Sequence, residues 1–219
     1  MFFSFDEGKG EKIKDLGLYK LDGNLHKCKW VKGVNGTALE FNGIDSYAKL
    51  SSHKILNFDK AEPFTISGWI KTTTNGAIFS MRKNPDRGSW AIIDAYLDSG
   101  KLKFWVRPHG DPFSPLDFRP APVLTDGKWH HFALGRMANG SVFAYVDGRT
   151  PQSTFGPFGN RPKVGGILTN ARLLGKASLD RNNHEHHWFG SLDELAIHNR
   201  VLSEAEVIAL AKQGGIKWE

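Results

Sequence analysis

The sequence predicts an all-β sandwich, and three observations support that fold class. Short segments of alternating apolar and polar residues recur along the chain with turn residues between them, which is typical of a sandwich or barrel. The chain has 219 residues, of which 40% are hydrophobic and 12% aromatic, and this suffices for one sizeable core. Only one convincing helix is found, near the C-terminal end. We therefore expect a single domain over residues 1–219.

The strands are predicted from apolar alternation and from the turns that end them. Asp98–Gly100 forms a turn between two of them, and Asn139–Gly140 readily takes the backbone angles of a tight hairpin. In chain order, the predicted strands are Phe64–Lys71, Trp90–Tyr96, Lys101–Arg107, Trp129–Arg136, Val142–Val146 and Leu192–His198. Each is short enough for a sheet of a compact sandwich.

The C-terminal helix has a clear start and stop. Ser203 and Glu206 form a capping box, in which each side chain bonds the backbone of the other residue. Apolar residues follow at helical spacing, and Gly214 with Gly215 ends the helix. The segment from Pro108 to Pro122 is rich in proline and is expected to be a long ordered loop, the kind of segment that often carries binding residues.

Charge and composition restrict the partners. The formal net charge is +6, but the Lys and Arg residues are scattered and do not form the dense patch of a nucleic-acid footprint. No apolar run is long enough to cross a bilayer, so membrane insertion is not expected. Met1–Asp6 lacks the features of a signal peptide. Cys28 is the single cysteine, which rules out an internal disulfide.

Three pairs of short motifs span nearly the whole chain. They are Phe3–Gly10 with Gly36–Gly43, Trp129–Ala133 with Tyr145–Gly148, and Phe189–Ile197 with Asn199–Ser203. In order and spacing they resemble the bacterial laminin-G-like (LamG) domains of the concanavalin A-like lectin/glucanase superfamily. The resemblance implies a jelly roll of two antiparallel sheets, one convex and one concave, followed by the short C-terminal helix.

The resemblance also implies a biological setting. Such domains are mostly extracellular or periplasmic modules attached to other domains of a larger protein. They bind glycans or proteins, or they pack against a neighbouring domain, so the fold alone leaves the function open. Within the second motif pair, Asp147 and Gly148 are expected to form a turn in which Asp147 is structural and bonds forward to the backbone.

An enzyme on this fold would need two carboxylates facing each other across a cleft. Related laminarinase-type enzymes carry them on one strand as Glu-x-Asp-x-x-Glu, and the closest stretch here contains only Asp193 and Glu194. Adjacent residues of a regular strand point to opposite faces, so these two are not expected to act as a pair. The Gln-x-His and Tyr-Lys-Gly signatures of the related alginate lyases are not found. We therefore expect no catalytic residues, and a glycoside hydrolase or polysaccharide lyase is the third alternative.

Two metal sites are considered. The histidine-rich segment His184–His187 contains residue types that bind zinc or copper, but convergent ligands with a supporting shell are not evident, and we favour a polar loop in which His187 and Trp188 pack against the sheet edge. The family resemblance implies a structural calcium ion, and the matching positions here are Asp6, Gly43 and Asp193. The alternative is that Asp193 accepts backbone hydrogen bonds at a bend of its strand.

A glycan site would combine an exposed aromatic ring with polar side chains. Trp105 lies on the face of its strand opposite Leu102, Phe104 and Val106, which are predicted to be core. The proposed ligand-binding patch on the concave sheet consists of Arg87, Trp90, Trp105, Arg107, His109 and Asp111. The alternative is that Trp90 or Trp105 only covers the sheet edge. Trp69 and Trp129 are expected in the core.

These arguments lead to a leading function and a second one. The leading hypothesis is a non-catalytic recognition module, for carbohydrate, of an exported multi-domain protein. The second is a structural or protein-interaction module without a small ligand. An exposed Trp105 beside Arg107 favours the first, and a flat polar face favours the second.

Overall fold

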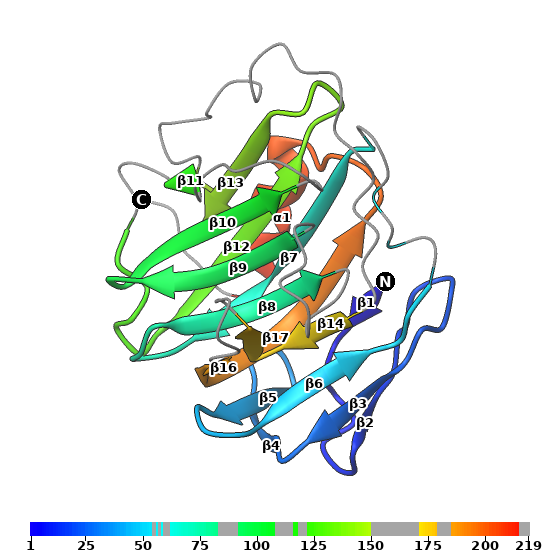
Figure 1. The fold of residues 1–219 in the computed structure, drawn as a ribbon, viewed down its shortest axis with the longest axis vertical. Helices are drawn as coiled ribbons and strands as arrows, with labels where there is room; N and C mark the ends of the chain where they lie inside the picture. Colours follow the sequence, from blue (N-terminus) through cyan, green and yellow to red (C-terminus); the bar gives the residue numbers. More distant parts are fainter. Residues whose placement is uncertain are drawn as a thin grey trace.

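The computed structural model describes residues 1–53, 56, 58, 62–82, 92–107, 116–117, 122–149, 171–178 and 185–214. They form two antiparallel sheets, a two-stranded ribbon and one helix, as the sequence predicts. In Figure 1 the eight-stranded sheet overlies the seven-stranded sheet. None of the helices in this part of the chain is long and apolar enough to span a membrane.

The seven-stranded sheet contains the strands that line the pocket described below. In spatial order they are β13 (Val142–Val146), β12 (Trp129–Arg136), β7 (Phe64–Lys71), β17 (Phe189–His198), β5 (Thr37–Asn42) and β4 (Lys29–Lys32), and β1 (Phe2–Phe3) pairs beside them with β17. β17 is central because it pairs with three strands, β1, β5 and β7. It therefore joins the first residues of the chain to the last motif.

The eight-stranded sheet supplies the other layer. In spatial order its strands are β11 (Leu116–Asp117), β10 (Lys101–Arg107), β9 (Ile92–Asp98), β8 (Gly76–Arg82), β14 (Ala171–Leu174), β6 (Tyr47–Leu50), β3 (Gly23–His26) and β2 (Lys12–Ile13). A separate ribbon is formed by β15 (Lys176–Ser178) and β16 (Glu185–His187).

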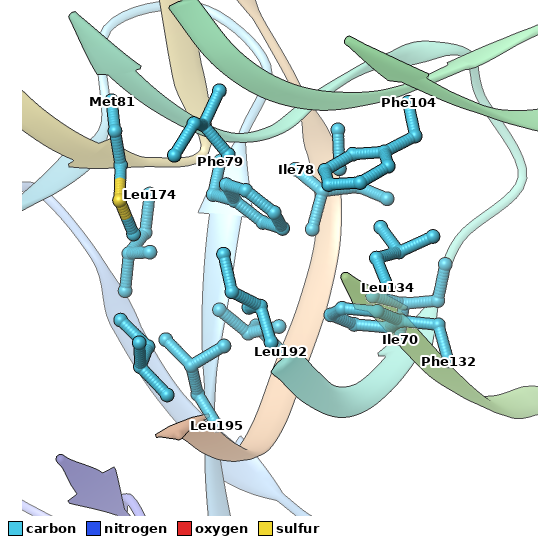
Figure 2. Packing of buried hydrophobic residues seen from close by; sticks show 14 of the residues in the cluster. Ile70, Ile78, Phe79, Met81, Phe104, Phe132, Leu134, Leu174, Leu192 and Leu195 are labelled. Atoms are coloured by element: carbon cyan, nitrogen blue, oxygen red, sulfur yellow. The ribbon is translucent and has the colours of Figure 1, made fainter. Parts of the chain in front are cut away.

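The core lies between the two sheets. Figure 2 shows Phe79 and Phe104 of the eight-stranded sheet approaching side chains of the seven-stranded sheet, among them Phe132, Leu192 and Leu195. All five side chains are 0–1% exposed and belong to one continuous apolar cluster. Burial of apolar area on this scale is the dominant favourable contribution to folding.

The predicted elements agree with the structure except at some ends. Five predicted strands, including Lys101–Arg107, have the observed bounds or lie within an observed strand. The strand expected at Trp90–Tyr96 is observed at Ile92–Asp98, and Trp90 lies outside the described residues. Within the predicted 108–122 loop, β11 pairs with β10, so that segment contributes an edge strand.

The helix α1 (Glu204–Gln213) confirms the predicted capping box. The backbone N–H of Ser203 donates to Glu206 Oε2 at 2.8 Å, and Glu206 N–H donates back to the Ser203 hydroxyl. Gly214 is the C-cap residue. Val207 of the helix packs with Ala133 and Leu202, which places α1 on the outward face of the seven-stranded sheet.

Candidate functional site

Trp105 lies on the outward face of the eight-stranded sheet, as predicted. Its strand neighbours Phe104 and Val106 are buried, whereas Trp105 is half-buried. The indole N–H donates to Tyr96 Oη at 2.9 Å, and the two rings meet edge to face. Tyr96 faces Lys103 across the β9–β10 pair, so Trp105 and Tyr96 are diagonal neighbours on one face. The hydrogen bond fixes the orientation of a partly exposed indole.

The rest of the predicted patch falls largely outside the described residues. Arg87, Trp90, His109 and Asp111 belong to that part of the chain. The backbone of Arg107 ends β10 opposite Ile92. Of the predicted patch, the structure describes the side chain of Trp105. That the other five residues gather around it stays a prediction.

Two of the three predicted calcium ligands lie at one turn, the glycine-flanked segment Gly33–Gly36. Asp193 is 0% exposed, and its Oδ2 accepts the backbone N–H groups of Val34 and Asn35 at 2.8 and 3.2 Å. Asp6 Oδ1 accepts the N–H of Thr37 at 2.9 Å. A Cβ atom on Gly33 would lie 2.4 Å from Asp193 Oδ2, so this close approach depends on glycine.

Gly43 is not brought to this turn. It follows the last residue of β5, whereas the turn precedes the first. Six strand residues separate the two ends by roughly 20 Å at about 3.3 Å per residue. Gly43 instead contacts Phe189 at the start of β17. The three positions do not surround one point, and a calcium ion remains an untested prediction.

The alternative considered for Asp193 is what the structure shows. The register of β17 against β7 shifts between Asp193 and Ala196, which is a β-bulge. Asp193 Oδ1 accepts the N–H of Glu194 at 2.9 Å, so the carboxylate caps the backbone where the strand bends. Burial raises the pKa of Asp193 to about 7, although the backbone N–H donors act in the opposite direction.

The bulge corrects the expectation that Asp193 and Glu194 point to opposite faces. Glu194 adopts a left-handed conformation with φ 50°, which interrupts the alternation of the strand. Both carboxylates approach Asn35: Asp193 through the backbone, and Glu194 Oε1 through the Asn35 amide at 3.4 Å. They still do not form an acid–base pair, because both oxygens of the buried Asp193 accept backbone N–H groups.

A pocket lies beside this bulge, on the outward face of the seven-stranded sheet. Its volume is about 180 Å³. β7, β12 and β17 supply one part of the lining, and the end of α1, Phe2 and the Gly33–Gly36 turn supply the rest. The lining residues are Phe2, Val34, Asn35, Ser67, Trp69, His131, Glu194, Ala196, His198, Leu210, Gln213 and Gly214.

Two histidines in this lining carry unsatisfied nitrogens. His131 Nδ1 and His198 Nε2 are buried and lack a hydrogen-bond partner within the described residues. Burial lowers the pKa of His131 to about 4 and also lowers the pKa of His198, to which the charge of Arg200 contributes. Both imidazoles are therefore neutral near neutral pH. Buried polar atoms without partners are uncommon in folded proteins, and each calls for an explanation.

The neighbouring His130 has the opposite character. Its Nδ1 lies 2.9 Å from Asp147 Oδ2 and its Nε2 lies 3.0 Å from Asp126 Oδ1. Both carboxylates raise the pKa of His130, Asp147 most strongly, against the effect of burial. Asp147 is structural, as expected, but it bonds back to His130 and to the His131 N–H, not forward as predicted.

The described end of the histidine-rich segment is not the polar loop of the alternative, because Glu185–His187 forms a strand paired with β15 and Trp188 belongs to the core. Trp188 is 0% exposed and packs against Phe41, and His187 ends β16. His184 lies outside the described residues. Within the part of the chain that the structure describes, His, Cys, Asp and Glu side chains form no cluster of three that suits a metal ion.

The pocket was not predicted from the sequence. Trp69 is buried, as expected, but under Gly214 on the outward face instead of between the sheets. Trp129, also expected in the core, is half-buried. The available signal was the pair Trp69 and His131, which both point outward from strands whose alternate residues form the core.

Comparisons with known proteins place the fold. The family described as the concanavalin A-like lectin/glucanases superfamily, of laminin-G type, matches residues 42–208. Botulinum neurotoxin type X from Clostridium botulinum is 23% identical over 208 residues, which are 91% of this chain and 15% of that protein. The chain thus spans a small part of that curated relative.

Two solved structures illustrate the range of proteins with this fold. One concerns botulinum neurotoxin type C, whose cell entry is described as dependent upon interaction with two ganglioside molecules (TM-score 0.72, 12% identity, 99% of this chain and 51% of that chain). The other is a Trypanosoma rangeli sialidase in complex with 2,3-difluorosialic acid (TM-score 0.67, 16% identity, 96% of this chain and 32% of that chain). At these identities the similarity concerns the fold.

Proposed function

Because this chain belongs to the concanavalin A-like lectin/glucanase superfamily, we propose that it is a non-catalytic recognition module for carbohydrate within an exported multi-domain protein. The observation that carries the proposal is the half-buried indole of Trp105, directed away from the core and held by Tyr96. An aromatic ring in this position can stack on the apolar face of a sugar. The fraction of the larger relatives that the chain covers supports a multi-domain parent.

The similarity to botulinum neurotoxins supports recognition more than a particular ligand. Gangliosides are described for a botulinum neurotoxin whose solved chain is covered to 51% by this chain, and a ligand of that solved chain does not show which half binds it. The sugar therefore has to be found by experiment. A glycan array probed with the purified chain, in calcium and in chelator, covers neutral and acidic glycans in one measurement.

Trp105→Ala tests whether the binding surface is the proposed one. We expect a loss of about 2 kcal/mol in affinity for the glycan found on the array, the size of a binding hot spot, with an unchanged fold. Trp129→Ala is the matched control, since it removes another half-buried tryptophan from the outward face of the other sheet. Equal glycan affinity of the wild type and Trp105→Ala would show that the glycan does not bind at the Trp105 surface. An array without any binder would favour the protein-interaction module.

The second part of the proposal is that the chain does not cleave polysaccharides. Asp193 is enclosed by backbone N–H groups and is unsuited to act with Glu194 on a glycosidic bond. We expect no reducing-sugar release from a panel of plant and marine polysaccharides beyond a heat-inactivated control. Release that persists in repeated preparations would identify an enzyme and contradict the proposal.

A further inference from the structure

The pocket beside the β17 bulge is a built site on the face opposite Trp105. Three strands, a helix end and a turn converge on it, and two histidines of its lining carry buried nitrogens without partners among the described residues. Glu194 stands in its wall in a left-handed conformation, which is uncommon for a residue other than glycine. Such backbone strain persists where surrounding contacts impose it, and it is concentrated at functional sites.

The volume of the pocket limits the size of a ligand. About 180 Å³ is less than the roughly 300–1,000 Å³ of pockets for drug-sized molecules. A cavity of roughly 150 Å³ in a protein interior accepts a benzene ring. The pocket therefore suits one substituted six-membered ring.

The charges of the lining select against anions. None of the described lining residues is Lys or Arg, and Glu194 lies close enough to Asp6 for the two charges to interact. An anionic ligand would meet a carboxylate without a compensating cation. The two imidazoles are neutral, which leaves Glu194, whose pKa is raised by burial, as the ionisable acid of the described lining.

The remaining groups suit an uncharged ligand with hydroxyl groups. Phe2, Trp69 and Leu210 provide apolar surface, while Asn35 and Ser67 add an amide and a hydroxyl to the two imidazoles. A neutral imidazole nitrogen either donates or accepts, depending on the tautomer, and so can satisfy a hydroxyl in both directions. We propose that this pocket binds a small uncharged ligand with an apolar face and several hydroxyl groups, the chemistry of a single pyranose ring.

This inference goes beyond the Trp105 surface, because the two sites occupy opposite faces of the sandwich and share no residue. The test uses the whole chain and neutral monosaccharides: glucose, galactose and N-acetylgalactosamine, with N-acetylneuraminate as the acidic comparison. Histidine side-chain ¹⁵N spectra report directly on the pocket, and the indole N–H of Trp105 reports on the other face. We expect saturable movement of the His131 and His198 nitrogens with at least one neutral sugar.

Variants assign the binding to the pocket. His131→Phe removes the ring nitrogens, and Ala196→Met fills the space. Each should weaken the affinity for the sugar by roughly tenfold or more, which corresponds to about one lost hydrogen bond or contact. Asn35→Ala changes an exposed lining residue and should weaken binding without disturbing the core, so it keeps the test valid if the buried variants unfold. His130→Gln and Trp105→Ala should leave the affinity unchanged.

Three outcomes overturn the inference. The first is the absence of saturable movement of either histidine up to the solubility limit of the sugars, which would leave the pocket to water. The second is a preference for N-acetylneuraminate. The third is binding that Trp105→Ala abolishes and His131→Phe preserves; this result would support the proposed function while removing the pocket as a second site.

Discussion

The two outward faces of the sandwich each carry a tryptophan, and the chain treats them differently. On the eight-stranded sheet Trp105 remains half-exposed and is tied to Tyr96 by one hydrogen bond. On the seven-stranded sheet Trp69 is 3% exposed, because Gly214 at the end of α1 lies against its ring. Outward position on a strand therefore does not mean exposure. A helix and a turn convert part of one outward face into a second buried layer with its own pocket.

The comparison of the two outward faces predicts that the largest loss of stability follows the removal of Trp69. Trp69→Ala should reduce the free energy of unfolding by roughly 3–5 kcal/mol, the range for truncating a large buried aromatic side chain. Its indole also meets His131 edge to face, so the pocket should lose its shape together with the packing under Gly214. Urea denaturation gives the value. A loss below about 1 kcal/mol would mean that α1 does not bury this face.

Asp193 tests the turn that forms the pocket wall. Asp193→Ala leaves three partly buried backbone N–H groups without this acceptor, and we expect the free energy of unfolding to fall by about 3 kcal/mol. Asp6→Ala is the control, because Asp6 is exposed and accepts one N–H from Thr37; we expect about 1 kcal/mol there.

Asp193→Ala also tests whether calcium binding contributes to the stability of the folded chain. A calcium ion that binds only the folded chain would raise the melting temperature, and chelator would lower it. Asp193→Ala would then remove the difference between calcium and chelator. Identical melting curves of the wild type in both conditions would instead assign Asp193 to capping the bulge alone.

The pH dependence of stability should differ in sign between the neighbours His131 and His130. The pKa of His131 is about 4 in the folded chain and about 6.5 when unfolded. On acidification the unfolded chain takes up its proton first, so the wild type should lose roughly 2 kcal/mol relative to His131→Phe between about pH 7 and pH 4.5. Urea titrations at several pH values measure this difference.

His130 provides the control of opposite sign. Asp147 and Asp126 raise its folded pKa, so its contribution is fully present below about pH 6.5 and is lost as the pH rises through the raised value. The wild type should therefore gain stability relative to His130→Gln on acidification. If both variants shift in the same direction, the assignment of neutral His131 to a buried pocket is wrong.

The strands of both sheets could be predicted because the pattern that indicates a strand involves residues close together in the sequence. The alternation of Leu102, Phe104 and Val106 against Trp105 decided which side of β10 faces the core, and the structure agrees. The capping box at Ser203 and Glu206 was equally local and was confirmed. Such signals depend on residues two to four positions apart, which a single sequence displays directly.

The pocket could not be predicted in the same way, because it depends on contacts between distant segments. Val34 and Asp193 are separated by 159 positions, yet a hydrogen bond between them closes the wall of the pocket. The bulge at Glu194 breaks the alternation on which the prediction of opposite faces relied. Trp69 and Trp129 both looked like core residues, and only the position of α1 explains why the first is buried while the second remains half-exposed.

The smallest expected effect is the stability change on removing Trp105. Part of its surface is already in water, and its one described hydrogen bond joins the indole to the hydroxyl of Tyr96, whose net contribution is about 1 kcal/mol. Trp105→Ala should therefore reduce the free energy of unfolding by about 1–2 kcal/mol, well below the value for Trp69→Ala. Tyr96→Phe should account for the hydrogen-bond part of that loss and leave the ring contact in place. A loss as large as that for Trp69 would mean that Trp105 is a structural cover of the sheet, and the protein-interaction module would then replace the glycan surface as the better interpretation of this face.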